Sequence, residues 1–240
     1  MVIYERTSST EIEIIDRWEN GFGWIAHPDE DTRRVSHAMR GRDGVYLFDP
    51  LDGPGLRSHL SELGTVFGVV VQSKFHARDA NVFAERYDVP VYLPTWMDRV
   101  ADQVEARVER YPSPPEEWVE LGSSGIDART IDSETAWTEV VVYDRTDDTL
   151  RTADLFATVP EFRIGNERLG VYILHRLSPP TAAFTGVDPE RILVGHGEGV
   201  FDDASETLNE TLSDARRHLP RALLTQLPAQ TIAFVVAMRE

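Results

Sequence analysis

The pattern of apolar and polar positions is clearest between residues 64 and 94. A continuous apolar run, Val66 to Val71, is typical of a strand that is covered on both faces. Polar residues follow, and from Ala80 the apolar spacing becomes helical until Pro90 stops the helix. A further apolar run from Val91 to Leu93 predicts another strand. In such a unit, the loop at the carboxyl end of the buried strand is the expected place for ligands.

The first half of the chain extends this pattern on both sides. Short alternating runs between residues 11 and 48 predict antiparallel strands, and a short helix is expected over residues 56–63. After the central unit, apolar spacing predicts a helix within residues 93–110. Residues 111–136 contain three prolines and are interpreted as an irregular excursion.

The second half repeats the rhythm of strands followed by helices. A β-rich part begins at Trp137, a helix is expected near residues 169–177, and a long helix is expected over residues 202–219. This rhythm favours two sheets packed face to face with helices outside. We therefore expect an α/β protein, a four-layer αββα sandwich formed by a single domain over residues 1–240. The strands of the second half are predicted at residues 140–143, 149–153 and 191–194.

The charge balance excludes several classes of partner. The chain has 41 acidic and 24 basic residues, a formal net charge of -17, and Lys74 is its single lysine. A surface this acidic repels nucleic acid and anionic membranes, so neither is expected as a partner. The chain has no cysteine, which excludes disulfides, thiolate metal sites and cysteine nucleophiles.

The same composition bears on the environment of the protein. An excess of Asp and Glu with almost no Lys resembles the proteins of salt-accumulating halophiles. The acidity would then be an adaptation of the solvated surface and would carry no information about a substrate. No apolar run approaches the length of a membrane span, and the N-terminus has neither a basic start nor an apolar core. A cytoplasmic location is therefore expected.

Three apolar strands end in polar residues that we expect to meet at one rim, over residues 73–79, 150–155 and 192–197. On these segments the sequence resembles the metallo-β-lactamase-fold superfamily, and the resemblance covers residues 24 to 217. The early strand-Asp-turn element of that family resembles the segment ending in Asp49. Its motif His-x-His-x-Asp-His falls on residues 74–79.

The resemblance also extends to the second half of the chain. The bridging aspartate of the family resembles Asp154, and the last ligand, in a Gly-His-Gly turn, resembles His196. The resemblance implies a pair of zinc or iron ions held by imidazoles and carboxylates at strand ends. It also implies hydrolysis of an ester, amide or phosphodiester.

The departures from the motif change this expectation. Lys74 stands where the motif has its first histidine, Arg78 where it has Asp, and Asp79 where it has its final histidine. No histidine lies between Gly122 and Trp137, where the family usually has a further ligand. The surviving candidates suffice for one divalent ion, zinc or iron, but hardly for two. These candidate metal ligands are His76, Asp79, Asp154 and His196.

Two interpretations of the site remain open at this stage. In the first, Lys74 and Arg78 replace metal charge by pairing with Asp79 and Asp154, and the metal-free rim binds a small anionic ligand or a protein partner. In the second, one metal ion supports hydrolysis of an ester, thioester or phosphodiester, and Lys74 or Arg78 stabilises an oxyanion. The candidate catalytic groups are Lys74, His76, Arg78, Asp79, Asp154 and His196.

Two further residues carry secondary predictions. A desolvated Lys74 beside Arg78 would suit Schiff-base chemistry, a third and weaker interpretation. His37 is otherwise expected to be structural, but a strand end near Asp49 would bring it to the rim.

Overall fold

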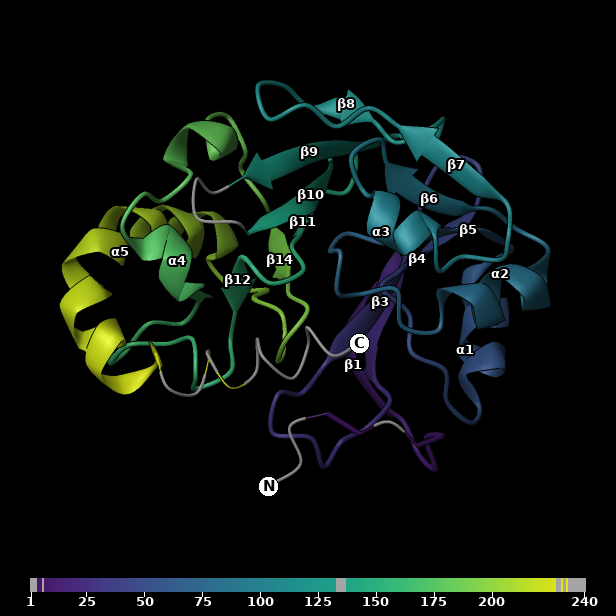
Figure 1. Ribbon diagram of the computed structural model, residues 1–240, viewed down its shortest axis with the longest axis horizontal. Coiled ribbons are helices and arrows are strands. Elements are labelled where there is room, and N and C mark those ends of the chain that lie inside the picture. The colour runs from purple at the N-terminus through teal and green to yellow at the C-terminus, as the bar shows by residue number, and fades with distance from the viewer. Residues whose placement is uncertain (1–3, 6, 133–136, 228–229, 231, 233–240) are drawn as a thin grey trace.

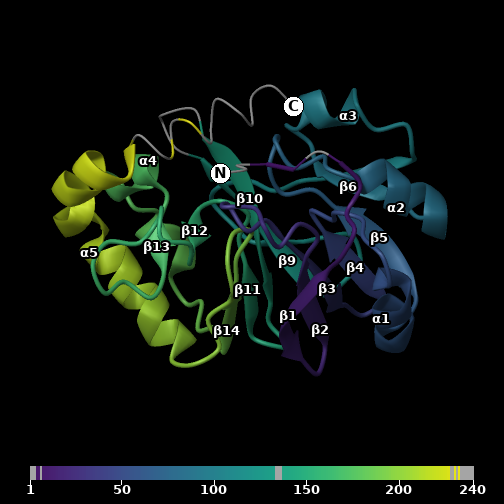
Figure 2. The same cartoon turned by 90° about the horizontal axis from the view of Figure 1, so that it is seen from below.

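The computed structural model describes residues 4–5, 7–132, 137–227, 230 and 232. Two β-sheets pack face to face, and helices cover their outer faces, as Figures 1 and 2 show. This four-layer αββα arrangement confirms the predicted fold class. Within the described residues, no helix is long and apolar enough to cross a membrane.

The first sheet has seven strands, and their order in the sheet is their order in the chain. Neighbours from β1 to β4 are antiparallel, and neighbours from β4 to β7 are parallel. The helices α1 (Leu56–Leu63), α2 (Ala80–Tyr87) and α3 (Asp98–Ala101) pack against this sheet through a shared apolar core. The strands are β1 (Glu13–Trp18), β2 (Gly21–Ile25), β3 (Val35–Arg40), β4 (Val45–Phe48), β5 (Val66–Val70), β6 (Val91–Pro94) and β7 (Val108–Tyr111).

The second sheet has five strands in the order β14-β11-β10-β9-β8, and its β11 and β14 are parallel. A small two-stranded sheet, the helix α4 (Ile173–Arg176), the short 3-10 helix η1 (Thr181–Phe184) and the long helix α5 (Ala204–Thr225) complete this half. The strands are β8 (Val119–Glu120), β9 (Ile126–Asp132), β10 (Thr138–Asp144), β11 (Thr149–Arg151), β12 (Phe156–Ala157), β13 (Gly170–Val171) and β14 (Arg191–Leu193).

A third apolar core lies between the sheets and joins them. Tyr46, Phe48 and Val70 of the first sheet share it with Val140 and Val142 of the second. Burial of large side chains such as these supplies most of the favourable free energy of folding. The inner faces of the two sheets are therefore packed against each other through these side chains.

The prediction of a helix within residues 93–110 is wrong over most of that range. Only α3 is helical there, and Val108–Tyr111 forms β7, which pairs in parallel with β6. The apolar spacing of this segment is compatible with either a helix or a strand. The exposed hydrogen-bonding edge of β6 favoured the strand. Residues 111–132 are also more regular than expected, because β8 and β9 lie there; residues 133–136 fall outside the described part of the chain.

Two predicted helices of the second half have different bounds in the structure. Residues 169–177 divide into β13 and α4. The long helix α5 continues through Pro220 to Thr225, because its buried face extends beyond the proline to Ala222.

Candidate functional site

The predicted rim lies where parallel strands of both sheets end. Asp49 follows β4 and His76 lies in the loop after β5, while Asp154 follows β11 and His196 follows β14. Because β4 pairs in parallel with β5 and β11 with β14, the carboxyl ends of each pair meet at one edge. The backbone hydrogen bond from Val140 N to Gln72 O links the two edges.

His76, Asp154 and His196 form a buried cluster. Their ligand atoms lie within 4.8 Å of one another. Nε2 of His196 is 3.1 Å from Oδ1 of Asp154, and Nε2 of His76 is 3.4 Å from Oδ2 of the same carboxylate. Two imidazole nitrogens and one carboxylate are ordinary donors for zinc or iron, so this set fits one divalent ion.

The Nδ1 atom of each imidazole already makes a hydrogen bond. Nδ1 of His76 donates to Oδ2 of Asp49 at 3.2 Å, and Nδ1 of His196 donates to the carbonyl oxygen of Thr32 at 2.8 Å. Hydrogen bonds of this kind fix the orientation of metal-binding imidazoles, because they leave Nε2 to face the ion. Oδ2 of Asp154 is buried, and within the described structure its contact with Nε2 of His76 at 3.4 Å falls short of hydrogen-bond geometry.

The charged groups of the cluster change one another's pKa values. Burial and the nearby Arg78 lower the pKa of His76, but the carboxylates of Asp154 and Asp49 outweigh them and raise it overall. Burial raises the pKa of Asp154, but His76 and His196 outweigh it and hold this pKa well below its usual range. The opposite shifts of His76 and Asp154 show that each of these two groups favours the charged form of the other.

Glu139 supports Asp154 from β10. Its side chain is fully buried, and its oxygens accept the N–H groups of Ala153 and Asp154 at 3.1 and 2.9 Å. Burial, reinforced by the charge of Asp154, raises the pKa of Glu139 to about 8. Glu139 thus fixes the peptide that carries the central carboxylate of the cluster.

Arg151 is a fully buried cation near the cluster that was not predicted from the sequence. Its side chain is fully buried, its Nη1 lies 3.0 Å from Oδ2 of Asp49, and its Nε donates to Nδ1 of His37 at 3.2 Å. The available signal was an arginine on a strand only three residues before Asp154. His37, which a strand end near Asp49 was expected to bring to the rim, pairs with Phe48 on β4, and its ring contacts Arg151 and Asp16 outside the cluster.

Comparisons with known proteins give the fold. No protein-family model matches the sequence, and no curated protein matches it either. Among solved structures, the DIM-1 metallo-β-lactamase superposes with a TM-score of 0.62 at 14% identity, over 86% of this chain and 98% of that one. The chain has the metallo-β-lactamase fold.

Two more structures with this fold agree with the assignment. FIM-1 from Pseudomonas aeruginosa, in its mono-zinc form, has a TM-score of 0.60 at 13% identity, over 89% of this chain and 98% of that one. The metal-soaked flavodiiron core of Flv1 from Synechocystis has a TM-score of 0.60 at 13% identity, over 88% of this chain and 62% of that one. Identities this low concern the fold and leave activity to be argued from the site.

Asp79 does not join the cluster formed by the other three candidate ligands. Arg78 adopts a left-handed backbone with φ 41°, which turns the chain just before Asp79, and α2 begins at the next residue. The Asp79 carboxylate therefore faces the loop after Asp49, where its Oδ2 accepts the N–H of Asp52 at 2.7 Å. The prediction of Asp79 as a metal ligand is corrected accordingly.

The predicted ion pairs of Lys74 and Arg78 are also corrected. Within the described part of the chain, neither cation pairs with Asp79 or Asp154, and Asp154 is paired with the two histidines instead. Arg78 Nη1 donates to the carbonyl oxygens of Val35 and Asp49, at 3.2 and 2.8 Å. These contacts place the guanidinium at the rim. Burial lowers the pKa of Arg78 there, and the nearby carboxylates of Asp49 and Asp154 partly offset this effect.

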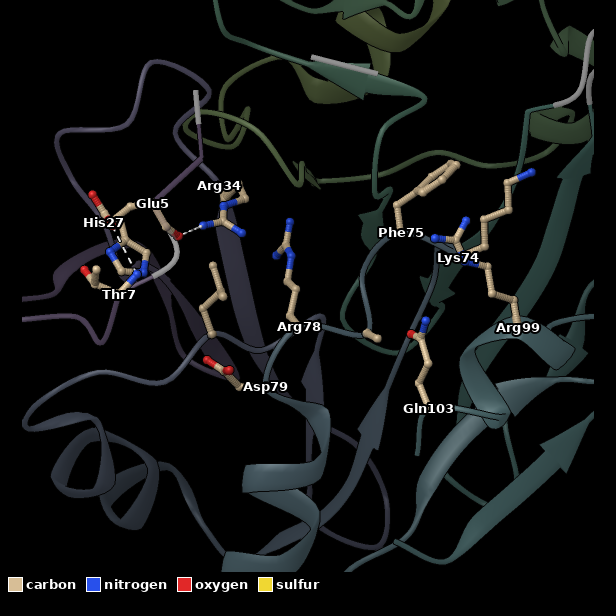
Figure 3. Close-up of a pocket in the computed structure, with 12 residues that line it drawn as sticks. Glu5, Thr7, His27, Arg34, Lys74, Phe75, Arg78, Asp79, Arg99 and Gln103 are labelled. Atoms are coloured by element: carbon tan, nitrogen blue, oxygen red, sulfur yellow. Dashed lines mark hydrogen bonds between the residues drawn. The ribbon is translucent and has the colours of Figure 1, made fainter. Parts of the chain in front are cut away.

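A pocket of about 320 Å³ is lined in part by the loop that carries His76, through residues 74, 75, 77 and 78, while the three cluster residues themselves are not among its lining. Figure 3 shows Arg34 and Arg78 on one side of it and Lys74 and Arg99 on the other, beside Phe75. Nζ of Lys74 and Cζ of Arg99 each lie 5.4 Å from the centroid of the Phe75 ring. On a protein with a net charge of -17, this pocket gathers four cationic side chains against two acidic ones, Glu5 and Asp79.

Proposed function

We propose that this protein binds a small anionic ligand or substrate in the cationic pocket, near a degenerate metal centre, with Arg78 and Lys74 supplying positive charge that meets the anion. The observation that carries the proposal is a hydrogen-bond donor of Arg78 that lacks an acceptor. Its Nη2 is buried and has no hydrogen-bond partner within the described structure. A buried guanidinium N–H without an acceptor is costly, and an anionic oxygen in the pocket would satisfy it.

The surrounding cations support the same ligand chemistry. Arg34 is held by Glu30 through Nε and Nη2, at 2.9 and 2.5 Å, so its own charge is largely compensated. Lys74 and Arg99 bring two positive charges to the single ring of Phe75. Positive potential inside a concave site attracts anions even when the whole protein is acidic.

The donor set limits the metal content that this proposal allows. His76, Asp154 and His196 offer three ligand atoms for one ion. A second ion would need donors at positions 74 and 78, and these positions hold cations. A protein with this site would therefore hold no metal or one divalent ion, zinc or iron.

A second candidate function is a single-metal hydrolase, favoured by the two fixed imidazoles. Nδ1 of His76 and Nδ1 of His196 both donate to oxygen acceptors, so both Nε2 atoms face Asp154. An ion bound there would act as a Lewis acid towards an ester, thioester or phosphodiester. Arg78 would then bind an anionic group of the substrate beside it.

Calorimetric titration with inorganic phosphate and with acetate tests the anion site. The wild-type protein should bind at least one of these anions, and Arg78→Ala or Lys74→Ala should weaken binding by about tenfold or more, through loss of a charge-assisted interaction. Arg86→Ala is the matched control, because Arg86 lies on α2 and pairs with Asp52 outside the pocket lining. Equal binding by Arg78→Ala and the wild type would refute the proposed role of Arg78.

The two candidate functions differ in their dependence on metal. Anion binding at a metal-free centre should survive treatment with a chelator. A hydrolase should bind about one equivalent of metal and cleave generic esters, thioesters or phosphodiesters, with His196→Ala abolishing both.

A further inference from the structure

Arg151 contacts three residues of the opposite sheet. It lies on β11, yet its guanidinium crosses the interface to Asp49 after β4, Gln72 after β5 and His37 on β3. It also lies over the ring of Phe48, with Cζ 5.4 Å from the centroid. One side chain of the second sheet is thereby fixed against three strands of the first.

Arg151 is connected to His76 through Asp49. Oδ2 of Asp49 accepts both Nη1 of Arg151, at 3.0 Å, and Nδ1 of His76, at 3.2 Å. Oδ1 accepts the N–H of Gln72 at 2.9 Å, so both carboxylate oxygens have partners. The orientation of the His76 ring therefore depends on a carboxylate that Arg151 holds in place.

Arg151 is connected to the loop that carries His196 through His37 and Asp16. Nε of Arg151 donates to Nδ1 of His37, so His37 presents its other nitrogen as the donor to Oδ2 of Asp16, at 3.1 Å. Oδ1 of Asp16 accepts the N–H of Gly199 at 2.8 Å. Gly199 follows His196 by three residues in the same loop.

We infer that Arg151 is a positioning residue that fixes both imidazoles of the site at once. Through Asp49 it orients His76, and through His37 and Asp16 it holds the loop that carries His196. A planar guanidinium with donors in fixed directions suits this task, whereas a lysine ammonium would not reach both acceptors with the same geometry. The inference rests on the proposed function in one respect, that the two imidazoles form the functional site.

Arg176 provides a matched control for the effect of burying an arginine. Its side chain is also fully buried, and its Nη1 and Nη2 both donate to Glu167, at 2.8 Å each. It lies on α4, and its partners in the described structure do not contact His76; its Nη2 also donates to the carbonyl oxygen of Phe162 at 2.7 Å, however, and the Phe162 ring stacks on His196. Loss of Arg176 should therefore weaken folding as loss of Arg151 does, without altering the ring of His76.

Two measurements on folded protein test the inference. Zinc affinity is measured by competition with a chelator, and the ring nitrogens of His76 and His196 are observed by NMR of ¹⁵N-labelled protein. Arg151→Met should weaken zinc binding by about 10- to 100-fold, as expected for loss of a partner behind a metal ligand. It should also change the ring signals of both histidines, whereas Arg176→Met should leave the ring signals of His76 unchanged. Arg151→Lys should behave as Arg151→Met.

Asp16→Asn keeps the inference testable if Arg151→Met does not fold. This smaller change removes the negative charge from one side of the network and should alter the ring signals of His196 more than those of His76. Unchanged histidine signals and zinc affinity in a folded Arg151→Met or Asp16→Asn protein would overturn the inference. If the wild-type protein binds no zinc, the hydrolase candidate fails, while the NMR comparison still decides the role of Arg151.

Discussion

The Nδ1 atom of His76 lies 3.2 Å from Oδ2 of Asp49, and this contact determines which nitrogen of the imidazole faces the cluster. With Nδ1 committed to a carboxylate, Nε2 is left to face Asp154. His196 repeats the arrangement, with a backbone carbonyl as the acceptor. The imidazole nitrogens are therefore oriented before any ligand binds, which lowers the entropic cost of binding one.

Gly195→Ala should disturb the cluster through its backbone. A Cβ at Gly195 would lie 2.2 Å from the carbonyl oxygen of Ala153, the residue before Asp154. Overpacking of this kind costs about 1–3 kcal/mol of the free energy of unfolding, and it should also shift the ring signals of His196. Gly186→Ala is the control, because its Cβ would meet nothing within 4 Å, although φ 78° adds backbone strain.

Chemical denaturation and NMR of the two variants measure these effects. Gly186→Ala should lose stability without altering the histidines. A Gly195→Ala protein with wild-type stability and unchanged His196 signals would contradict the close approach of the two loops.

His175 should make the stability of the protein depend on pH. Burial lowers the pKa of His175 to about 4, and its Nε2 has no hydrogen-bond partner within the described structure. An unfolded histidine titrates near pH 6.5, so between pH 6.5 and 4 the unfolded chain binds more protons, and the free energy of unfolding falls as pH falls. The full effect is about 3 kcal/mol.

Comparison with His175→Leu isolates this contribution. The difference in unfolding free energy between the variant and the wild type should move in favour of the variant by about 3 kcal/mol on acidification from pH 7 to pH 4. A difference that stays constant over this range would show that His175 titrates normally in the folded protein.

The acidic composition leads to a prediction about salt. With a net charge of -17, repulsion between carboxylates should destabilise the folded protein in dilute buffer. Salt also weakens the surface ion pairs, but each of these contributes little, so screening of the excess acidic charge should dominate. The melting temperature should rise between dilute buffer and molar KCl, and an unchanged value would contradict the halophilic interpretation of the composition.

Local signals were sufficient to predict several elements from the sequence. The bounds of α1 and α2 agree with the prediction because each helix ends at a local signal, Gly64 for α1 and the approach to Pro90 for α2. The segment that contains β7 was mispredicted because its structure depends on the free edge of β6, a partner that periodicity cannot reveal.

The residues of the site also divide into those with a local signal in the sequence and those without one. His76, Asp154 and His196 were predicted because each follows an apolar strand in the order of the family motif. Arg151 and Glu139 were missed because a charged residue that faces into a sheet interface has no local signature; its role depends on the opposite sheet. Asp79 was misplaced because motif spacing does not show the left-handed turn at Arg78.

The central claim is that cations at positions 74 and 78 leave a site for no more than one divalent ion. The most direct test is elemental analysis of protein that is saturated with zinc and then freed of unbound metal by gel filtration. The account predicts at most about one equivalent per chain, lost in His196→Ala. About two equivalents per chain, as in a two-metal centre, would contradict it.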